Sequence, residues 1–397
     1  MNPEDFEDSS PGRLVLIGHH EKPCFAFVPN PLPPTLQLDT KIFNGMSEAA
    51  LALGELAGLG RSMANPNLLI SPFIRREAVL SSRIEGTQTN IANLYAYESE
   101  QLTLPGILPS PPKSDPKSDP KSDAKEVLNY VRSLEYGLQR LETLPVCLRF
   151  IRELHERLVE GVRGENATPG EFRRIQNWIG PQTGNMEDAR FIPPPVPEMS
   201  GSLRDFEAYL NRECDYPPLI RIGLIHYQFE TIHPFLDGNG RIGRLITSLL
   251  LLHWKLLPLP LLYLSAFFER HRQDYYDLML AVSQRGAWQD WLLFFLRGVT
   301  EQSQDAVIRS KKLQDLQLRW RDKLSQARAS ALLPRLADSL FESPILTIPK
   351  AQKILNVTYR SAQQNVEKLV NAGILEQVNS GSGTKLFRAP EVLDILD

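Results

Sequence analysis

Apolar residues recur with helical spacing along most of the chain. Between residues 219 and 232, Ile222, Ile225, Phe229 and Ile232 are three or four positions apart and therefore share one face of a helix. Residues 241–254 and 288–296 also read as helices with apolar faces, and residues 41–103 read as further helices. The pattern predicts a mainly α-helical fold.

Proline-rich and low-complexity stretches divide this helical pattern. Residues 1–40 are rich in proline, and we expect them to be irregular. The unit Pro-Lys-Ser-Asp begins at Pro112 and is repeated twice more through Asp123, with no apolar residue to bury, which predicts a flexible exposed loop. The predicted parts are an N-terminal region 1–110, a linker 111–124, a helical core 125–300, a charged helical connector 301–335 and a C-terminal module 336–397.

The C-terminal module has a pattern of its own. Residues 348–355 and 359–371 read as two short helices, with Thr358 as the N-cap of the second and Gly373 beyond its end. Residues 374–378 and 384–388 read as a β-hairpin. This order resembles a winged helix, in which the second helix often enters the DNA major groove.

The surface that would face DNA is only mildly basic. Its candidate residues are Arg360, Gln363, Gln364 and Lys368, with Lys385 and Arg388 near the wing. A protein-docking or dimerising module is an equal alternative, so DNA, a protein target and a second copy of the chain all stay open as partners.

Composition restricts the partners and the cellular location expected for the protein. The chain has 397 residues and a net charge of −3, so no overall attraction to nucleic acid or acidic lipid is expected. Three scattered cysteines show neither zinc spacing nor a disulfide framework. The N-terminus lacks an apolar signal segment, and the apolar run 245–264 contains His253, Lys255, Pro258 and Pro260. We expect a cytoplasmic protein with no membrane partner.

The stretch 233–244, HPFLDGNGRIGR, concentrates groups suited to a polyphosphate. Gly238 and Gly240 can adopt positive φ, which lets the backbone point N–H groups inward at the start of the next helix. Arg241 and Arg244 are three positions apart, so both guanidiniums can reach phosphate oxygens from one helix face.

Three other side chains of this stretch supply chemistry. Asp237 is a hard oxygen ligand for Mg²⁺ bound to phosphates, Asn239 can hold a phosphate oxygen, and His233 suits general base catalysis on a hydroxyl. Each residue alone is better explained as part of a Gly-Asn turn, with a core histidine and solvated arginines. All of them together indicate transfer of part of a nucleoside triphosphate.

Two nucleotide-binding patterns are excluded. Residues 238–243 match G-x-G-x-x-G, but the preceding run reads as a helix and no βαβ pattern follows. The P-loop pattern is absent from the sequence.

The stretch resembles the Fic/DOC family signature H-x-F-x-(D/E)-G-N-G-R-x-x-R and matches it at every fixed position. Residues 151–155, 169–173 and 176–180 also resemble the family's core. The resemblance implies a protein adenylyltransferase that moves AMP from ATP to a Tyr, Thr or Ser hydroxyl of a target protein, or of the chain itself, and releases pyrophosphate. Mg²⁺ is the implied metal, with Mn²⁺ as an alternative.

The resemblance also implies roles for individual residues. His233 would deprotonate the acceptor hydroxyl, and Asp237 would hold the metal. The implied ATP-binding residues are Asp237, Gly238, Asn239, Gly240, Arg241, Gly243, Arg244, Tyr275 and Tyr276, with Arg244 at the γ-phosphate. Ile192, Pro193 and Pro194 would form a flap that orients the target. Ser283 stands where the family has an Asn at the base, and Tyr275 and Tyr276 can equally be core aromatics.

A second pattern implies a brake. Ser81, Glu85 and Gly86 match the family's inhibitory pattern (S/T)-x-x-x-E-(G/N), with Gly86 as a plausible helix C-cap. Glu85 would pair with Arg244 and occupy the γ-phosphate position. The alternative is a solvated glutamate at a helix end.

Rival functions stay open at this stage. The chain can be a Fic enzyme that removes AMP or moves another nucleotide, or a DNA-binding regulator whose Fic core only senses ATP.

Overall fold

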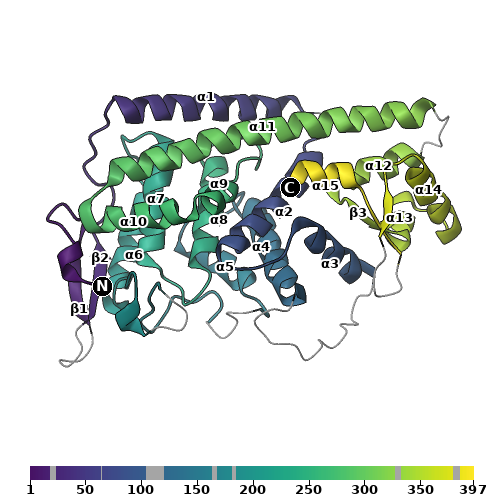
Figure 1. Ribbon diagram of the computed structural model, residues 1–397. Helices are drawn as coiled ribbons and strands as arrows, with labels where there is room; N and C mark the ends of the chain where they lie inside the picture. Colours follow the sequence, from purple (N-terminus) through teal and green to yellow (C-terminus); the bar gives the residue numbers. More distant parts are fainter. Residues whose placement is uncertain are drawn as a thin grey trace. The chain divides into compact units, whose positions relative to one another are not determined.

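The computed structural model describes residues 1–17, 24–63, 65–103, 120–162, 168–180, 185–326, 332–378 and 385–397, which form a mainly α-helical fold (Figure 1). The chain divides into two compact units. The first comprises Met1–Glu55, Arg132–Pro258 and Leu264–Ser303, and the second comprises Leu56–Val131, Leu259–Tyr263 and Gln304–Asp397. Helices α1 (Thr40–Ser62), α4 (Pro120–Arg140) and α11 (Trp288–Gln326) contribute residues to both.

The first unit is built around two buried helices. Its elements besides those three helices are η1 (Pro3–Asp5), β1 (Gly12–Ile17), β2 (Cys24–Pro29), α5 (Leu148–Leu158), η2 (Met186–Asp188), α6 (Val196–Asn211), α7 (Pro218–Ile232), α8 (Asn239–His253), α9 (Ser265–Arg270) and α10 (Arg272–Arg285). α7 and α8 pack against each other, and most of their residues are buried. Both helices were predicted from their apolar spacing, although α8 begins two residues earlier than expected.

The N-terminal residues differ from the prediction. We expected an irregular segment, but β1 and β2 form an antiparallel hairpin in which Gly12 pairs with Pro29 and Ile17 with Cys24. β2 packs on α6 and α7, and its Ala26 and Phe27 are fully buried. The hairpin therefore depends on burial against helices distant in sequence, which local proline content does not reveal.

The second unit contains α2 (Asn67–Ile84), α3 (Ile91–Thr103), α12 (Leu332–Glu342), β3 (Ile345–Thr347), α13 (Ile348–Leu355), α14 (Tyr359–Asn371), β4 (Glu376–Val378), β5 (Leu386–Arg388) and α15 (Pro390–Leu396). The strands form an antiparallel sheet in the order β3-β5-β4. The two predicted short helices are confirmed, as is the cap, because Thr358 Oγ1 accepts from the Ser361 N–H at 3.3 Å. Part of the predicted wing, residues 379–384, lies outside the described residues.

Two predicted boundaries fall inside helices. Residues 111–119 of the predicted linker lie outside the described residues, but its last repeat begins α4 at Pro120. Proline is tolerated in the first turn of a helix because the N–H it lacks would have no partner there. The predicted core boundary at residue 300 lies within α11, which continues to Gln326.

The apolar run 245–264 contains the end of α8 and a non-helical connection to α9. Among the described residues, no helix has the length and apolar character needed to cross a membrane.

Candidate active site

The motif 233–244 forms the connection from α7 to α8. His233 ends α7 in the left-handed conformation, with φ 48° and ψ 59°. Gly238 precedes α8 with φ 80°, as its lack of a Cβ allows. Gly240, for which we also expected a special conformation, is instead an ordinary residue of the first turn of α8. Gly238 therefore turns the chain, and Gly240 belongs to the first turn of the helix.

Asn239 closes the loop on itself. Its Oδ1 accepts from the Phe235 N–H and its Nδ2 donates to the Phe235 carbonyl, both at 2.8 Å, and the residue is buried. We expected this amide to hold a phosphate oxygen, but its oxygen and one of its hydrogens bind the backbone. The side chain shapes the loop that presents the first N–H groups of α8, which have no partner within the helix.

His155 on α5 forms hydrogen bonds that support the motif loop. Its Nε2 lies 3.1 Å from the Asp237 carbonyl, and its Nδ1 accepts from the Gly170 N–H at 3.0 Å, so Nε2 carries the proton. Burial is the main cause that lowers the pKa of His155 to about 4. The ring is therefore neutral near pH 7 and acts as a fixed spacer, a role that the sequence analysis did not assign.

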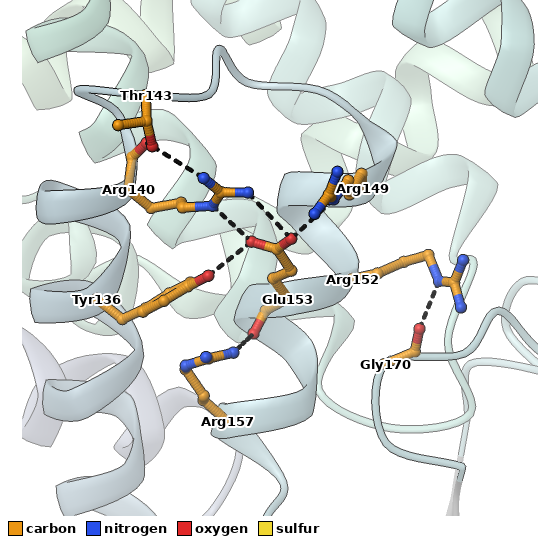
Figure 2. Close-up of polar contacts among 8 residues, drawn as sticks. All are labelled: Tyr136, Arg140, Thr143, Arg149, Arg152, Glu153, Arg157 and Gly170. Carbon is orange, nitrogen blue, oxygen red and sulfur yellow. Dashed lines mark hydrogen bonds and ion pairs between the residues drawn. The ribbon is translucent and has the colours of Figure 1, made fainter.

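A polar cluster (Figure 2) joins α4 to α5, the helix that carries His155. The Glu153 carboxylate accepts from Arg140 Nε at 2.9 Å, from Arg149 Nε at 2.9 Å and from the Tyr136 hydroxyl at 2.6 Å. Hydrogen bonds from Arg140 are the main cause that lowers the pKa of Glu153 to about 2. Arg157 lies over the Tyr136 ring, 3.5 Å from its centroid. These contacts fix the helix that carries the spacer histidine.

The His233 ring has an assigned tautomer. Its Nδ1 lies 3.1 Å from the Glu230 carbonyl, which can only accept, so Nδ1 carries the proton. Nε2 is then the basic nitrogen. This is the tautomer that a general base needs.

The two arginines of the motif are buried rather than solvated. Arg241 is 1% exposed and Arg244 is 2% exposed, and both lie in the first two turns of α8. Cations are unfavourable at a helix N-terminus, where the dipole favours anions. Arg241 lies 3.6 Å from the half-exposed Asp237 carboxylate. The arrangement suits a polyphosphate with its own counter-cation.

A cavity of about 590 Å³ lies beside the end of α7. That volume is typical of small-ligand sites. Its lining comes from the turn of α7 before His233, from α10 and from residues 179–180 and 188–191. The lining residues are Ile179, Gly180, Asp188, Arg190, Phe191, Glu230, Thr231, Arg272, Tyr276, Met279, Leu280 and Ser283.

The two tyrosines of the predicted pair have different positions relative to the cavity. Tyr276 lines it, whereas Tyr275 is buried and its hydroxyl lies 2.8 Å from His226 Nε2. Tyr275 is therefore a core aromatic, in line with the alternative interpretation. Ser283 lines the cavity, and its hydroxyl lies 2.8 Å from that of Tyr227.

The predicted flap is tied to the body of the first unit. The Ile192 carbonyl accepts from the Phe27 N–H at 2.9 Å, and the Ile192 N–H donates to the sulfur of Met1 at 3.3 Å. The Pro193 carbonyl accepts from Gln176 Nε2 at 3.0 Å, and the Pro194 carbonyl accepts from Arg173. The target-orienting role of these residues stays a prediction.

The remaining predicted residues belong to the second unit. α2 contains the buried Ser81. The half-buried Glu85 is its C-cap, in place of the predicted Gly86, which follows with φ 102°. Arg244 belongs to the first unit, so the pairing of Glu85 with Arg244 stays a prediction.

On α14 the DNA-facing candidates are exposed but share their face with an acidic residue. Arg360, Gln364 and Lys368 are exposed, and so is Glu367, whose carboxylate accepts from Gln363. DNA binding stays a prediction.

Known proteins are similar in sequence to the regions that contain the motif 233–244 and the segment with Glu85. Residues 145–251 match the Fic/DOC family, and residues 43–139 match the family's N-terminal region. The protein adenylyltransferase Fic of Culex quinquefasciatus is 31% identical over 162 residues, which are 40% of this chain and 29% of that protein. The protein of the same name from Drosophila grimshawi is 32% identical over 130 residues, 32% of this chain and 25% of that protein. The matched stretch thus spans less than a third of the length of these curated relatives.

Solved structures share the fold. A Fic family protein from Desulfovibrio desulfuricans G20 aligns with a TM-score of 0.56 and 20% identity over 90% of this chain and 98% of its own. A Fic domain containing signaling protein from Bacteroides thetaiotaomicron aligns with a TM-score of 0.50 and 19% identity, over 68% of this chain and 96% of its own. The two family regions together cover about half of the chain and include the motif 233–244, and the protein belongs to the Fic/DOC family.

Proposed function

We propose that this protein is a protein adenylyltransferase. One observation carries the proposal: the hydrogen bond from Nδ1 of His233 to the Glu230 carbonyl, 3.1 Å long, makes Nε2 the basic nitrogen. This histidine ends α7, and residues 234–238 lead from it to a helix N-terminus with two buried arginines. A cavity large enough for a nucleoside lies beside the same end of α7. The relatives named protein adenylyltransferase Fic support the same activity.

The reaction is an exchange at the α-phosphorus of ATP. His233 Nε2 takes the proton of a Tyr, Thr or Ser hydroxyl as its oxygen forms a bond to the α-phosphorus. The bond between that phosphorus and the oxygen bridging to the β-phosphate breaks, and pyrophosphate leaves. Because this transfer depends on positioning and on charge stabilisation, the N–H groups of α8 with Arg241 and Arg244 supply the main catalytic contribution.

Asp237 would hold Mg²⁺ or Mn²⁺ on the phosphates. Its carboxylate is 42% exposed, and its Oδ1 accepts from the Gly238 N–H at 2.7 Å. No cluster of three or more His, Cys, Asp or Glu side chains suited to a metal occurs among the described residues. One carboxylate with substrate phosphates is the usual protein contribution to Mg²⁺, so the residues fit the ion. The ion supplies charge neutralisation on the phosphates.

Glu85 would restrain the reaction. Its carboxylate stands at the C-terminal end of α2, where the helix dipole disfavours negative charge. Pairing with a buried guanidinium such as that of Arg244 would compensate for this cost. While paired with Glu85, Arg244 would not be able to bind the γ-phosphate of ATP. The brake is then a competition between one carboxylate and the terminal phosphate of ATP.

The test follows label from the α-phosphate of ATP onto the chain itself and onto a protein mixture. The wild type, Glu85→Gly, His233→Ala and the double variant are compared with Mg²⁺, with Mn²⁺ and with EDTA. Glu142→Gly, which changes an exposed glutamate in a turn, is the matched control for the glycine substitution. We expect label to rise at least tenfold in Glu85→Gly alone and to disappear in the double variant.

The product separates the rival activities. A mass increase equal to AMP supports adenylylation, and a different nucleotide mass identifies another donor. Release of AMP from a labelled chain would identify the reverse reaction. Nucleotide binding without transfer by any variant would favour a regulator that only senses ATP and would overturn the proposal.

A further inference from the structure

A buried cation, Arg173, lies outside the motif. Arg173 lies between α5 and residue 179, is 1% exposed and is among the largest fully buried side chains of the described residues. No role was predicted for it. Burying a guanidinium is costly, and an apolar side chain of similar volume would often stabilise a core equally well. The position of this residue therefore calls for an explanation other than packing.

Among the described residues, this guanidinium donates hydrogen bonds to backbone carbonyls alone. Nε donates to the His233 carbonyl at 3.0 Å, Nη2 donates to the Pro194 carbonyl and Nη1 lies 3.4 Å from the Ile175 carbonyl. The backbone N–H of Arg173 donates to the Pro234 carbonyl at 2.8 Å. One side chain thus bridges the residue before the motif loop and the segment predicted as the flap.

The geometry of the bridge is rigid. Nε and Nη2 lie on the same edge of the planar guanidinium, so the carbonyls of His233 and Pro194 are held at a set separation. Neighbouring amides act in parallel: Asn177 Nδ2 donates to the Phe235 carbonyl at 2.8 Å, and Gln176 Nε2 donates to the Pro193 carbonyl at 3.0 Å.

His233 needs such support. Its left-handed backbone conformation, with φ 48°, is strained for a residue with a Cβ and persists only where surrounding contacts impose it. Arg173 and Asn177 both donate to its carbonyl, at 3.0 and 3.3 Å. These two donors help to impose the conformation that presents the imidazole to the site.

We propose that Arg173 is a positioning residue that fixes the distance between the base His233 and the backbone of residues 193–194. It acts through the backbone carbonyls of His233 and Pro194. It sets where an acceptor hydroxyl held against residues 193–194 stands relative to His233 Nε2. This inference rests on the proposed function, because it specifies how the acceptor is placed for that reaction.

The test compares Arg173→Lys with Arg174→Lys, both also in the Glu85→Gly chain. Arg173→Lys keeps the charge but removes the planar fork. Arg174 is the matched control, since it is adjacent, its side chain is 81% exposed and it pairs with Glu171 at the surface. Three quantities are measured: the rate of label transfer, the dissociation constant of ATP with Mg²⁺, and the amide exchange rates of residues 191, 192, 233 and 235.

We expect Arg173→Lys to slow transfer about 100-fold, as a displacement of about 1 Å does in a positioned reaction. ATP affinity should stay within twofold, because the phosphate loop keeps its contacts from His155 and Asn239. Amide exchange should accelerate in both segments, and Arg174→Lys should change none of the three quantities.

Two outcomes would overturn the inference. One is unchanged transfer in a folded Arg173→Lys chain, and the other is loss of transfer in step with ATP affinity. If no chain transfers label, the proposed function fails. Amide exchange alone then tests whether Arg173 connects His233 to residues 193–194. Faster exchange in both segments then supports the bridge, and a change in only one segment or in neither overturns it. Arg173→Gln, whose short amide cannot reach both the His233 and the Pro194 carbonyl, provides the second variant if Arg173→Lys does not fold.

Discussion

The ring of His155 stacks on the ring of Phe235 with centroids 3.8 Å apart and planes 7° apart. The same imidazole spans from the Gly170 N–H to the Asp237 carbonyl. His155 thereby contacts the motif loop in two ways: its ring stacks on Phe235, and its Nε2 hydrogen-bonds the Asp237 carbonyl. The loop that would bind phosphates is shaped by a histidine about 80 residues earlier in the chain.

Replacing His155 tests this support. His155→Leu should lower the free energy of unfolding by about 2–4 kcal/mol, because two buried backbone groups lose their partner. Label transfer should fall at least tenfold. His155→Gln, whose amide can both donate and accept, should recover more than half of each loss. Thermal unfolding and the transfer assay measure both, and equal behaviour of the two variants would contradict the spacer role.

Stability should decrease as the pH falls from 6.5 towards 4. The pKa of His155 is lowered to about 4 and that of His226 to about 3, in both cases mainly by burial. Above pH 6.5 both the folded and the unfolded chain hold these histidines neutral, so stability is complete. Between pH 6.5 and the folded pKa the unfolded chain binds protons that the folded chain does not, which destabilises the fold.

For His155 this loss is on the order of 3 kcal/mol when complete. Unfolding in urea at pH 7.5, 6.0 and 5.0 measures it. Tyr275→Phe, which removes a hydroxyl partner of His226, is expected to lower stability at every pH while the decrease on acidification persists. A midpoint that does not change with pH would refute the prediction.

Gly243→Ala should harm the packing of α7 on α8. A Cβ at this position would lie 2.3 Å from Glu230 Oε1, so the side chain of this buried glutamate must move. We expect a loss of about 1–3 kcal/mol in unfolding free energy and a reduced transfer rate, because Glu230 precedes His233 by less than one turn. Gly201→Ala on α6, where an added Cβ meets nothing within 4 Å, is the matched control. It should stabilise the chain by up to about 1 kcal/mol, and similar effects of both changes would disprove the reasoning.

Tyr276 and Tyr275 should respond differently to substitution. Tyr276→Ala removes one wall of the cavity and should weaken ATP binding about tenfold with little effect on stability, since loss of an aromatic contact in a binding site is worth about 1–2 kcal/mol. Tyr275→Phe should lower stability while leaving ATP affinity within twofold, because its hydroxyl serves the core. Calorimetric titration with ATP and thermal unfolding separate the two. The opposite assignment of effects would place the nucleobase elsewhere.

The sequence by itself determined the features that depend on neighbours along the chain. The apolar spacing of Ile222 and Phe229 predicted α7, the N-cap of Thr358 predicted the start of α14, and Gly238 predicted the turn before α8. Helix period, caps and positive φ act over a few residues, so they can be read locally. The motif 233–244 likewise carried its chemistry in one short stretch.

Only the tertiary structure decided which polar groups turn inward. Asn239 binds the backbone of its own loop, Tyr275 gives its hydroxyl to His226, and Arg173 bridges residues 194 and 233. The β1–β2 hairpin also forms where an irregular segment was expected. The partner of Asn239 is only four residues away, but the other outcomes depend on partners farther along the chain. Burial forces a polar group to find such a partner, and the fold alone decides which partner is within reach.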